Sequence, residues 1–220
     1  FRRVLFRSYI EIELRQSHEY KLLLQAGLST PNDQVVNLEK ELKILAIPGA
    51  VFSIEQCLQV RKLLEETKAV FQWFNPDRRI SYEGLAQVLE GVSYEKKPLE
   101  EIQAVLEEQG GIRDNASAAL LQIRSSLSKK RSEVRRVFER VIQKWSKAGY
   151  VADVEEAFLN GRRVIAVTAE HKRQVKGILL GESDTRKTAF LEPEETIALN
   201  NDVLELEGEE SREVYRILRQ

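Results

Sequence analysis

The residues that could do chemistry in this sequence are basic and lie in its second half. Between Arg124 and Lys187 the chain has 16 lysines and arginines against 8 aspartates and glutamates, although its net charge is −1. A basic segment in a neutral chain is typical of proteins that bind a polyanion. We therefore expect these lysines and arginines to form ion pairs with phosphate groups rather than to make or break bonds.

The candidate contacts form two groups. The first lies at predicted turns and strand ends within residues 150–193 and comprises Arg162, Arg163, His171, Lys172, Arg173, Lys176, Arg186 and Lys187. The second falls on one stripe of a long predicted helix and comprises Lys129, Arg136, Arg140, Lys144 and Lys147. Cations of this kind contact backbone phosphates, which gives binding that is sensitive to salt and tolerant of sequence.

Aromatic residues are scarce beside these cations. Tyr150, Phe158 and Phe190 are the ones close to the predicted turns, which argues against a stacking platform for single-stranded bases. A duplex or a structured RNA is the better interpretation. The structural alternative is a sheet edge that lysine and arginine protect from pairing with another chain.

Catalytic motifs are not found in the sequence. The nearest approach to a phosphate-binding loop is residues 181–188, but Arg186 stands where the glycine before the lysine is needed, and a strand ending at Pro193 follows in place of a helix. His18, His171 and Cys57 do not have the spacing of metal ligands. The acidic pairs Glu155-Glu156 and Glu194-Glu195 lie at the ends of predicted elements, and we interpret them as solvated surface rather than as acid/base catalysts. The sequence therefore predicts no enzyme, cofactor or metal within these residues.

The elements that would position the basic residues are a long helix and a small sheet. Asp114 or Asn115 is the expected cap of a helix that runs to Lys147 within residues 113–149, about 50 Å long at ~1.5 Å per residue. Its apolar positions form one stripe, which a second helix should cover. They are Leu120, Ile123, Leu127, Val134, Phe138, Val141 and Trp145.

Residues 150–193 have the period-two pattern and β-branched content of strands. Two such runs, Val151–Leu159 and Arg162–Thr168, flank Asn160-Gly161, which is typical of a hairpin turn because both residues tolerate positive φ. We expect a second hairpin turn at 169–174, which places His171, Lys172 and Arg173 on it, and further strands at 175–180 and 188–192. A returning helix should fill 194–220.

The first half predicts a helical core at residues 9–112. Its expected helices are 10–26, 35–46, a third that starts at a capping box of Ser53 and Gln56 and stops at Asn75-Pro76, 82–90, and a last that runs from Pro98 to Gly110-Gly111. The predicted fold class is thus mainly α: a helical core and long antiparallel helices, with a small antiparallel β tip inserted between them.

The ends and the composition suggest part of a longer protein from a reducing compartment. The chain has no methionine, and its last residues continue a helical pattern. Residues 1–8 are rich in arginine and are interpreted as a leader foreign to the rest. The single cysteine, Cys57, excludes an internal disulfide and is expected in the core. No apolar run is long enough for a membrane span, and no signal peptide is found.

Several motifs, taken together, resemble the MutS family, and most closely its second bacterial branch, the endonuclease MutS proteins. Residues 111–124 resemble the start of the family's lever helix. Its clamp segment is similar, in the same order, to Asn160-Gly161-Arg162, Glu170-His171-Lys172-Arg173, Gly177-Ile178, Phe190-Leu191-Glu192-Pro193 and Leu199-Asn200-Asn201. The similarity is strong from residue 110 onward and weaker before it.

The resemblance implies a function for these elements. Levers and clamps of a homodimer would enclose double-stranded or branched DNA, or ribosomal RNA, and pass a conformational signal to an ATPase domain beyond Gln220, which would hold ATP and Mg²⁺. A nuclease domain would lie further on. The parent would act in the bacterial cytoplasm in DNA repair, suppression of recombination, or ribosome rescue. The alternative is a helical structural or dimerisation module that does not bind nucleic acid.

Two residues depart from the family pattern in the loop before the last strand. The family usually has an acidic residue where Gly181 stands and a glycine where Arg186 stands. If that glycine serves a turn with positive φ, Arg186 should be strained there. The same arginine would add a positive charge to the loop.

Overall fold

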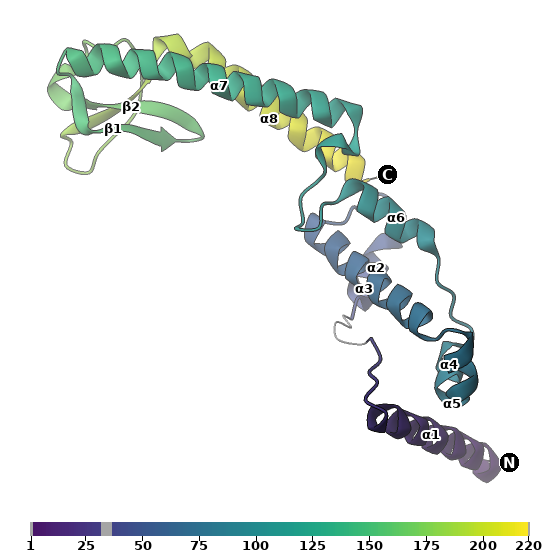
Figure 1. Cartoon of the computed structure of the whole chain (residues 1–220). Coiled ribbons are helices and arrows are strands. Elements are labelled where there is room, and N and C mark those ends of the chain that lie inside the picture. Colours follow the sequence, from purple (N-terminus) through teal and green to yellow (C-terminus); the bar gives the residue numbers. More distant parts are fainter. Residues whose placement is uncertain (1, 32–36, 220) are drawn as a thin grey trace. The chain divides into compact units, whose positions relative to one another are not determined.

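Helices make up most of this computed structural model, which describes residues 2–31 and 37–219. A four-stranded antiparallel sheet comes between the two longest helices of the second half in the order of the chain, and it lies against one side of them (Figure 1). The fold class is therefore mainly α with a small β insert, as predicted. The chain divides into two compact units, unit 1 (Phe1–Arg113 with Leu218–Gln220) and unit 2 (Asp114–Ile217).

The described part of unit 1 is mainly helical. Its helical elements are α1 (Arg2–Gln25), α2 (Glu39–Leu45), α3 (Ile54–Trp73), α4 (Pro76–Ser81), α5 (Glu83–Ala86), the 3-10 turn η1 (Gln87–Leu89) and α6 (Lys96–Val105). The capping box is confirmed, because Ser53 Oγ accepts from the Gln56 amide and the Gln56 side chain accepts from the Ser53 amide. The start predicted for the second helix, 35–36, lies outside the described residues.

Unit 1 differs from the prediction in two places, a helix that was not predicted and a helix that ends early. Asn75 caps a further helix, α4, whose first residue is Pro76, where the missing amide costs no hydrogen bond. The predicted stop of the third helix at Asn75-Pro76 is confirmed, since α3 ends at Trp73, but helix α4 after it was not predicted. Helix α6 ends at Val105 and not at Gly110-Gly111, because Leu106 pairs with Ile112 in an isolated bridge and the chain turns between them.

Buried polar contacts hold these helices together. The Glu19 carboxylate of α1 accepts hydrogen bonds from the Gly84 and Leu85 amides at 3.0 and 2.8 Å, and so joins α1 to α5. The buried guanidinium of Arg61, on α3, donates to the backbone carbonyls of Glu107 and Glu108. These contacts satisfy backbone groups that the short helices leave unpaired.

Unit 2 is built on helices α7 (Ala118–Lys147) and α8 (Glu194–Leu218). The N-cap of α7 is Ser117, whose Oγ accepts from the Leu120 amide. The prediction of Asp114 or Asn115 as the cap is wrong, since a 3-10 turn, η2 (Asp114–Ala116), precedes Ser117. Because Asp114 and Asn115 are already part of a 3-10 helix, the residue that caps α7 is the next one with a hydroxyl side chain, Ser117.

The two long helices run antiparallel and lie side by side (Figure 1). Three ion pairs join them. Arg124, near the start of α7, pairs with Glu210 at 2.7 Å, and Lys130 and Arg131, further along α7, pair with the earlier α8 residues Asp202 at 2.8 Å and Glu207 at 2.7 Å. Between them Leu127 and Val134 pack against Val203. The predicted apolar stripe is confirmed, with its central members buried and Ile123 and Trp145 half-buried.

The sheet has the strand order β1-β2-β4-β3. Its strands are β1 (Val151–Leu159), β2 (Arg162–Thr168), β3 (Gly177–Glu182) and β4 (Thr188–Pro193). The Asn-Gly hairpin is confirmed, with φ of 51° at Asn160 and 75° at Gly161. One face of the sheet packs on α7 around Phe138, which is fully buried against Ile165, Val167 and Leu191.

The second predicted hairpin is wrong. Strands β2 and β3 are not neighbours, because both pair with β4, and they therefore run parallel to each other. Residues 169–176 form a crossover that leaves the end of β2 and reaches the start of β3 at the other end of the sheet. Val175 of this crossover is buried in the core with Phe138. His171, Lys172 and Arg173 thus lie on the crossover and not on a hairpin turn.

Gly177 allows β3 to approach β4, and we expect its replacement by alanine to destabilise unit 2. An added Cβ would overlap the carbonyl oxygen of Glu192, a backbone atom that cannot rotate away. Gly177→Ala should lower the free energy of unfolding by about 1–3 kcal/mol, as overpacking does. Gly208→Ala on α8 is the control, where the nearest atom belongs to the flexible Arg212 side chain. That change should stabilise the helix by up to ~1 kcal/mol. Equal effects in urea unfolding would contradict the close approach.

Glu213 gives unit 2 a defined dependence on acid. Hydrogen bonds from Arg216 and from Ser117, the cap of α7, lower the pKa of Glu213 to about 2. Since the folded-state pKa is depressed, the stabilisation is complete above the ordinary carboxyl value of about 4.3 and disappears as the pH falls toward 2. The stability difference between the parent and Glu213→Gln in urea unfolding should therefore be present at pH 7 and shrink below pH 5. Glu205→Gln, on the same helix and exposed, should show no such trend.

Candidate nucleic-acid interface

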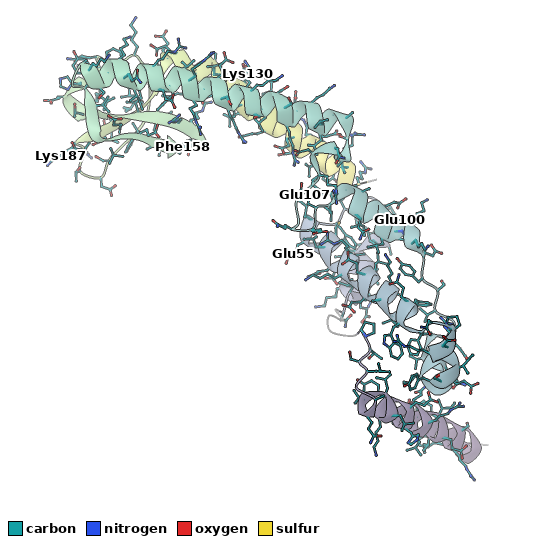
Figure 2. The ribbon with its side chains drawn as sticks, viewed as in Figure 1. Glu55, Glu100, Glu107, Lys130, Phe158 and Lys187 are labelled. Carbon is teal, nitrogen blue, oxygen red and sulfur yellow. The ribbon has the colours of Figure 1, made fainter. Side chains whose placement is uncertain are left out.

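The sheet has two ends, which separate the predicted contacts. Thr168 of β2 lies opposite Thr188 of β4, and Glu182 of β3 lies opposite Ala189, so the 169–176 and 183–187 segments both begin at this end. We call it the loop end. The Asn160-Gly161 turn, Gly177 and Pro193 lie at the other end, the hairpin end. Figure 2 shows Lys187 at the loop end and Phe158 near the hairpin end.

A stack of rings joins α7 to the loop end. The rings of Trp145 and Tyr150 stack at a centroid distance of 5.8 Å, and those of Tyr150 and His171 at 4.4 Å. His171 Nδ1 lies 2.7 Å from the Thr168 hydroxyl oxygen, and Lys144 Nζ lies 4.5 Å from the centre of the Trp145 ring. His171 is therefore held in one orientation. Sequence reasoning placed Trp145 only on the apolar stripe, and no spacing rule would have paired it with His171.

The cations of the loop end differ in how they are balanced. Lys172 forms an ion pair with Glu182 at 2.7 Å. The hydrogen bond from Lys172, its positive charge and the charge of Arg186 lower the pKa of Glu182. Arg173, Arg186 and Lys187 are exposed and make no ion pair within the described residues. Their charges are thus available to a ligand, whereas that of Lys172 is shared.

The strain predicted at Arg186 is confirmed. This residue has a φ of 54°, in the left-handed region that favours glycine. Its amide donates to the Ser183 carbonyl at 2.8 Å, and the Ser183 hydroxyl accepts from the Thr188 amide at 3.1 Å, which closes the turn before β4. Gly181 lies at a register shift of β3 and has space for a side chain. The turn keeps a basic residue at a strained position.

Arg162 is occupied by contacts within unit 2. It donates to both oxygens of Glu192 at 2.7 Å and to Asn201 at 2.7 Å, while Asn200 donates to Glu192 at 2.8 Å. Glu192 is 1% exposed, so this arginine neutralises a buried carboxylate. Three motifs that sequence reasoning recorded separately meet in this one network.

Arg163 and Lys176 also lie at the hairpin end. Arg163 pairs with Glu156 at 2.6 Å, and its guanidinium lies 4.5 Å from the centre of the Phe138 ring. Lys176 is exposed, and its carbonyl accepts from the Glu194 amide. The structure therefore does not bring these predicted contacts together with those of the loop end. A six-residue strand, roughly 20 Å long, separates the two groups.

The basic stripe of α7 is exposed along its length, as predicted. Lys129, Arg136, Arg140 and Lys147 make no ion pair with any part of the chain that the structure describes, and Lys144 lies 4.0 Å from Glu195. From Lys129 to Lys147 the stripe extends about 27 Å at ~1.5 Å per residue. We call these five residues the outer stripe.

Sequence reasoning missed a second set of α7 cations. Arg131 and Arg135 lie on the side of α7 that carries the sheet, where they line a groove of about 440 Å³ with Phe158 and Arg163. At 100° per residue both fall within about 60° of Phe138. A helical wheel centred on Phe138 would have found them. Arg131 is paired with Glu207.

Three features bear on metal, nucleotide and thiol chemistry among the described residues. Among the described residues no group of three or more histidine, cysteine or acidic side chains could hold a metal ion. Residues 181–188 do not have the form of a phosphate-binding loop, because the turn has Arg186 in place of a glycine and leads into β4. Burial raises the pKa of the Cys57 thiol, which disfavours the reactive thiolate. None of the described helices is long and apolar enough to cross a membrane.

Comparison with known proteins identifies the family. The chain is 29% identical over 216 residues to Endonuclease MutS2 of Gemmatimonas aurantiaca, which covers 97% of the chain. It is 32% identical over 213 residues to Endonuclease MutS2 of Clostridium botulinum strain Alaska E43, and 28% identical over 184 residues to that of Aquifex aeolicus, covering 95% and 83% of the chain.

No family model matches the chain. The chain spans about a quarter of the length of these relatives, 26%, 26% and 24% respectively. The similarity nevertheless extends across both units, since it covers up to 97% of the chain. The chain therefore belongs to the MutS family, in its MutS2 branch.

Proposed function

We propose that unit 2 is the lever and clamp of a larger MutS2 protein and holds the backbone of a nucleic-acid duplex. The observation that supports this proposal is that some cations of unit 2 have an acidic partner within the unit and others do not. Lys130, Arg131, Arg162 and Arg163 each pair with an acidic side chain of the same unit. Most of the outer stripe and the exposed cations of the loop end have no such partner in the described chain.

Unpaired cations have a physical consequence for binding. A lysine or arginine already matched by a carboxylate releases little free energy when it meets a phosphate, since it must lose its first partner. An unmatched cation displaces the counterions that surround the phosphate, and their release drives binding. The outer stripe is straight because a helix carries it, which suits the regular phosphate rows of a duplex better than a flexible single strand.

The helices supply a route between the clamp and the rest of the protein. The sheet is fixed to α7 by the Phe138 core and to the start of α8 by the Glu192 network. We propose that a load on the sheet is passed along this antiparallel pair to an ATPase domain outside the chain. The relatives are named endonucleases, and we propose that the whole protein acts as a homodimer in DNA repair or recombination.

We expect reversal of unpaired cations to weaken duplex binding at least tenfold. The two variants are Lys129→Glu/Arg136→Glu/Arg140→Glu on the outer stripe and Arg173→Glu/Arg186→Glu/Lys187→Glu at the loop end. Fluorescence anisotropy with a labelled 30-base-pair duplex over a salt series would report both affinity and slope. Each lost phosphate contact should reduce the slope of log K against log salt by ~0.9.

The matched control reverses three exposed lysines of unit 1, Lys62→Glu/Lys68→Glu/Lys96→Glu, and so changes the net charge equally. It should retain the parent slope. Equal losses in all three variants would mean that net charge alone governs binding. Parent-like affinity in both unit 2 variants would exclude the clamp and leave the structural module. Competition by a structured RNA of equal length would tell which polymer is preferred.

A further inference from the structure

A groove opens between the β1–β2 hairpin and the two long helices. It has a volume of about 440 Å³, and residues of α7, α8, the hairpin turn and both strands line it. Arg135 of this groove and its neighbour Arg136 of the outer stripe face different sides of α7, since at ~100° per residue they lie about 60° and about 160° from Phe138. The groove is therefore separate from the outer stripe. We call it the hairpin groove, and its charged and aromatic side chains are those of Arg131, Arg135, Glu156, Phe158, Arg163 and Glu207.

Phe158 lines the hairpin groove and is open to solvent. It lies opposite Arg163 in the β1–β2 register, so the two side chains belong to one face of the sheet. On that face the Arg163 guanidinium lies 4.5 Å from the centre of the Phe138 ring of α7. Phe158 therefore faces the helices, yet it is 70% exposed at the hairpin end (Figure 2). Its ring is a surface on which another flat ring can stack.

The arginines of the hairpin groove differ in their partners. Arg163 pairs with Glu156 at 2.6 Å, and Arg131 pairs with Glu207 at 2.7 Å. Arg135 is exposed and makes no ion pair with any residue that the structure describes. The groove thus offers one guanidinium to an anionic group, beside two partly exposed carboxylates that can accept hydrogen bonds.

We propose that the hairpin groove binds a nucleoside phosphate, with its base stacked on Phe158 and its phosphate paired with Arg135. Every base has a flat face that can stack on an aromatic ring, and a guanidinium binds a phosphate through two parallel hydrogen bonds. The N–H groups at the edge of the base can donate to Glu156 and Glu207. The scarcity of aromatic residues argues against a platform for a run of bases, but a single base needs a single ring.

A nucleoside phosphate suits the groove better than an acidic peptide. A peptide would bring several carboxylates toward Glu156 and Glu207, whereas a nucleotide brings one anionic group and one flat ring, which match Arg135 and Phe158. The volume lies within the roughly 300–1,000 Å³ of small-molecule sites. The nucleotide could be free or an unpaired residue of a strand, since a second groove of about 410 Å³ shares Arg131 and Arg135 with the first. The inference goes beyond the proposed function, whose duplex contacts lie outside this groove.

Saturation-transfer NMR with the 220-residue chain and deoxyadenosine monophosphate tests the site. The transfer should be strongest at the base protons, because the base contacts Phe158. Phe158→Ala and Arg135→Ala should each weaken binding about fivefold or more, and both residues are exposed, so neither change should alter urea unfolding. Tyr215→Ala, an exposed ring of α8 outside the groove, is the control and should bind like the parent. Equal binding of inorganic phosphate or of N-acetylphenylalanine, or an unchanged Phe158→Ala, would overturn the proposal.

A second measurement identifies the source of the nucleotide. Fluorescence anisotropy compares a labelled blunt duplex with the same duplex carrying one unpaired deoxyadenosine at a 3′ end. If the groove takes an unpaired residue of a strand, the tailed duplex should bind about fivefold tighter, and Phe158→Ala should remove that difference. If it takes a free mononucleotide, the two duplexes should bind equally while deoxyadenosine monophosphate still binds.

Neighbouring variants on α7 separate this inference from the duplex proposal. Arg136→Ala, on the outer stripe, should weaken both duplexes and leave binding of the mononucleotide as in the parent, whereas Arg135→Ala should weaken binding of the mononucleotide. A duplex affinity that does not depend on Arg136 would count against the outer stripe alone. No binding of deoxyadenosine monophosphate, together with equal affinities for the two duplexes, would refute the hairpin groove.

Discussion

A buried carboxylate at the junction of the sheet and the returning helix governs the architecture of unit 2. Glu192 is almost completely inaccessible to water and accepts from Arg162 and Asn200. A buried charge without partners would cost several kcal/mol, roughly 3–5 when one partner of a pair is lost. The hairpin, the last strand and the first turns of α8 must therefore keep the positions that satisfy it.

That constraint fixes the role of Arg162, and other contacts within unit 2 fix the roles of other cations. The residue types are the same throughout the basic segment, but their roles differ with their surroundings. Arg162 neutralises Glu192, Arg163 covers the Phe138 ring, and Arg131 ties α7 to α8. Most of the exposed cations without an ion pair among the described residues lie on the outer side of α7 and around the loop end, while Lys176 lies at the hairpin end and Arg135 on the sheet side of α7. Cations that have no acidic partner within unit 2 therefore lie on surfaces that a polyanion could reach.

Local patterns predicted the elements well. The bounds of β1 and β2 are confirmed, because Asn160-Gly161 fixes a two-residue turn whose flanks must pair. The apolar stripe of α7 is confirmed, because it depends only on helical period. The glycine-like conformation of Arg186 was also foreseen, from a comparison with the family pattern.

Non-local geometry was not available from the sequence. The 169–176 segment carries turn signals, but only the pairing of β4 with both β2 and β3 makes it a crossover. Arg162 was predicted to contact a ligand, since its carboxylate partner is 30 residues away and nothing in the spacing marks that carboxylate as buried. Asp114 and Asn115 are both good caps, and the choice of Ser117 depended on the turn before it.

The ring stack of Trp145, Tyr150 and His171 has a spectroscopic consequence. The chain contains two tryptophans, Trp73 in unit 1 and Trp145 in unit 2, so each unit carries one tryptophan fluorophore. The Trp145 ring contacts Lys144 and stacks, through Tyr150, with His171 of the crossover. The Trp73 ring contacts Arg78 instead. Emission from Trp145, isolated by Trp73→Phe, would therefore report events at the loop end without any attached label.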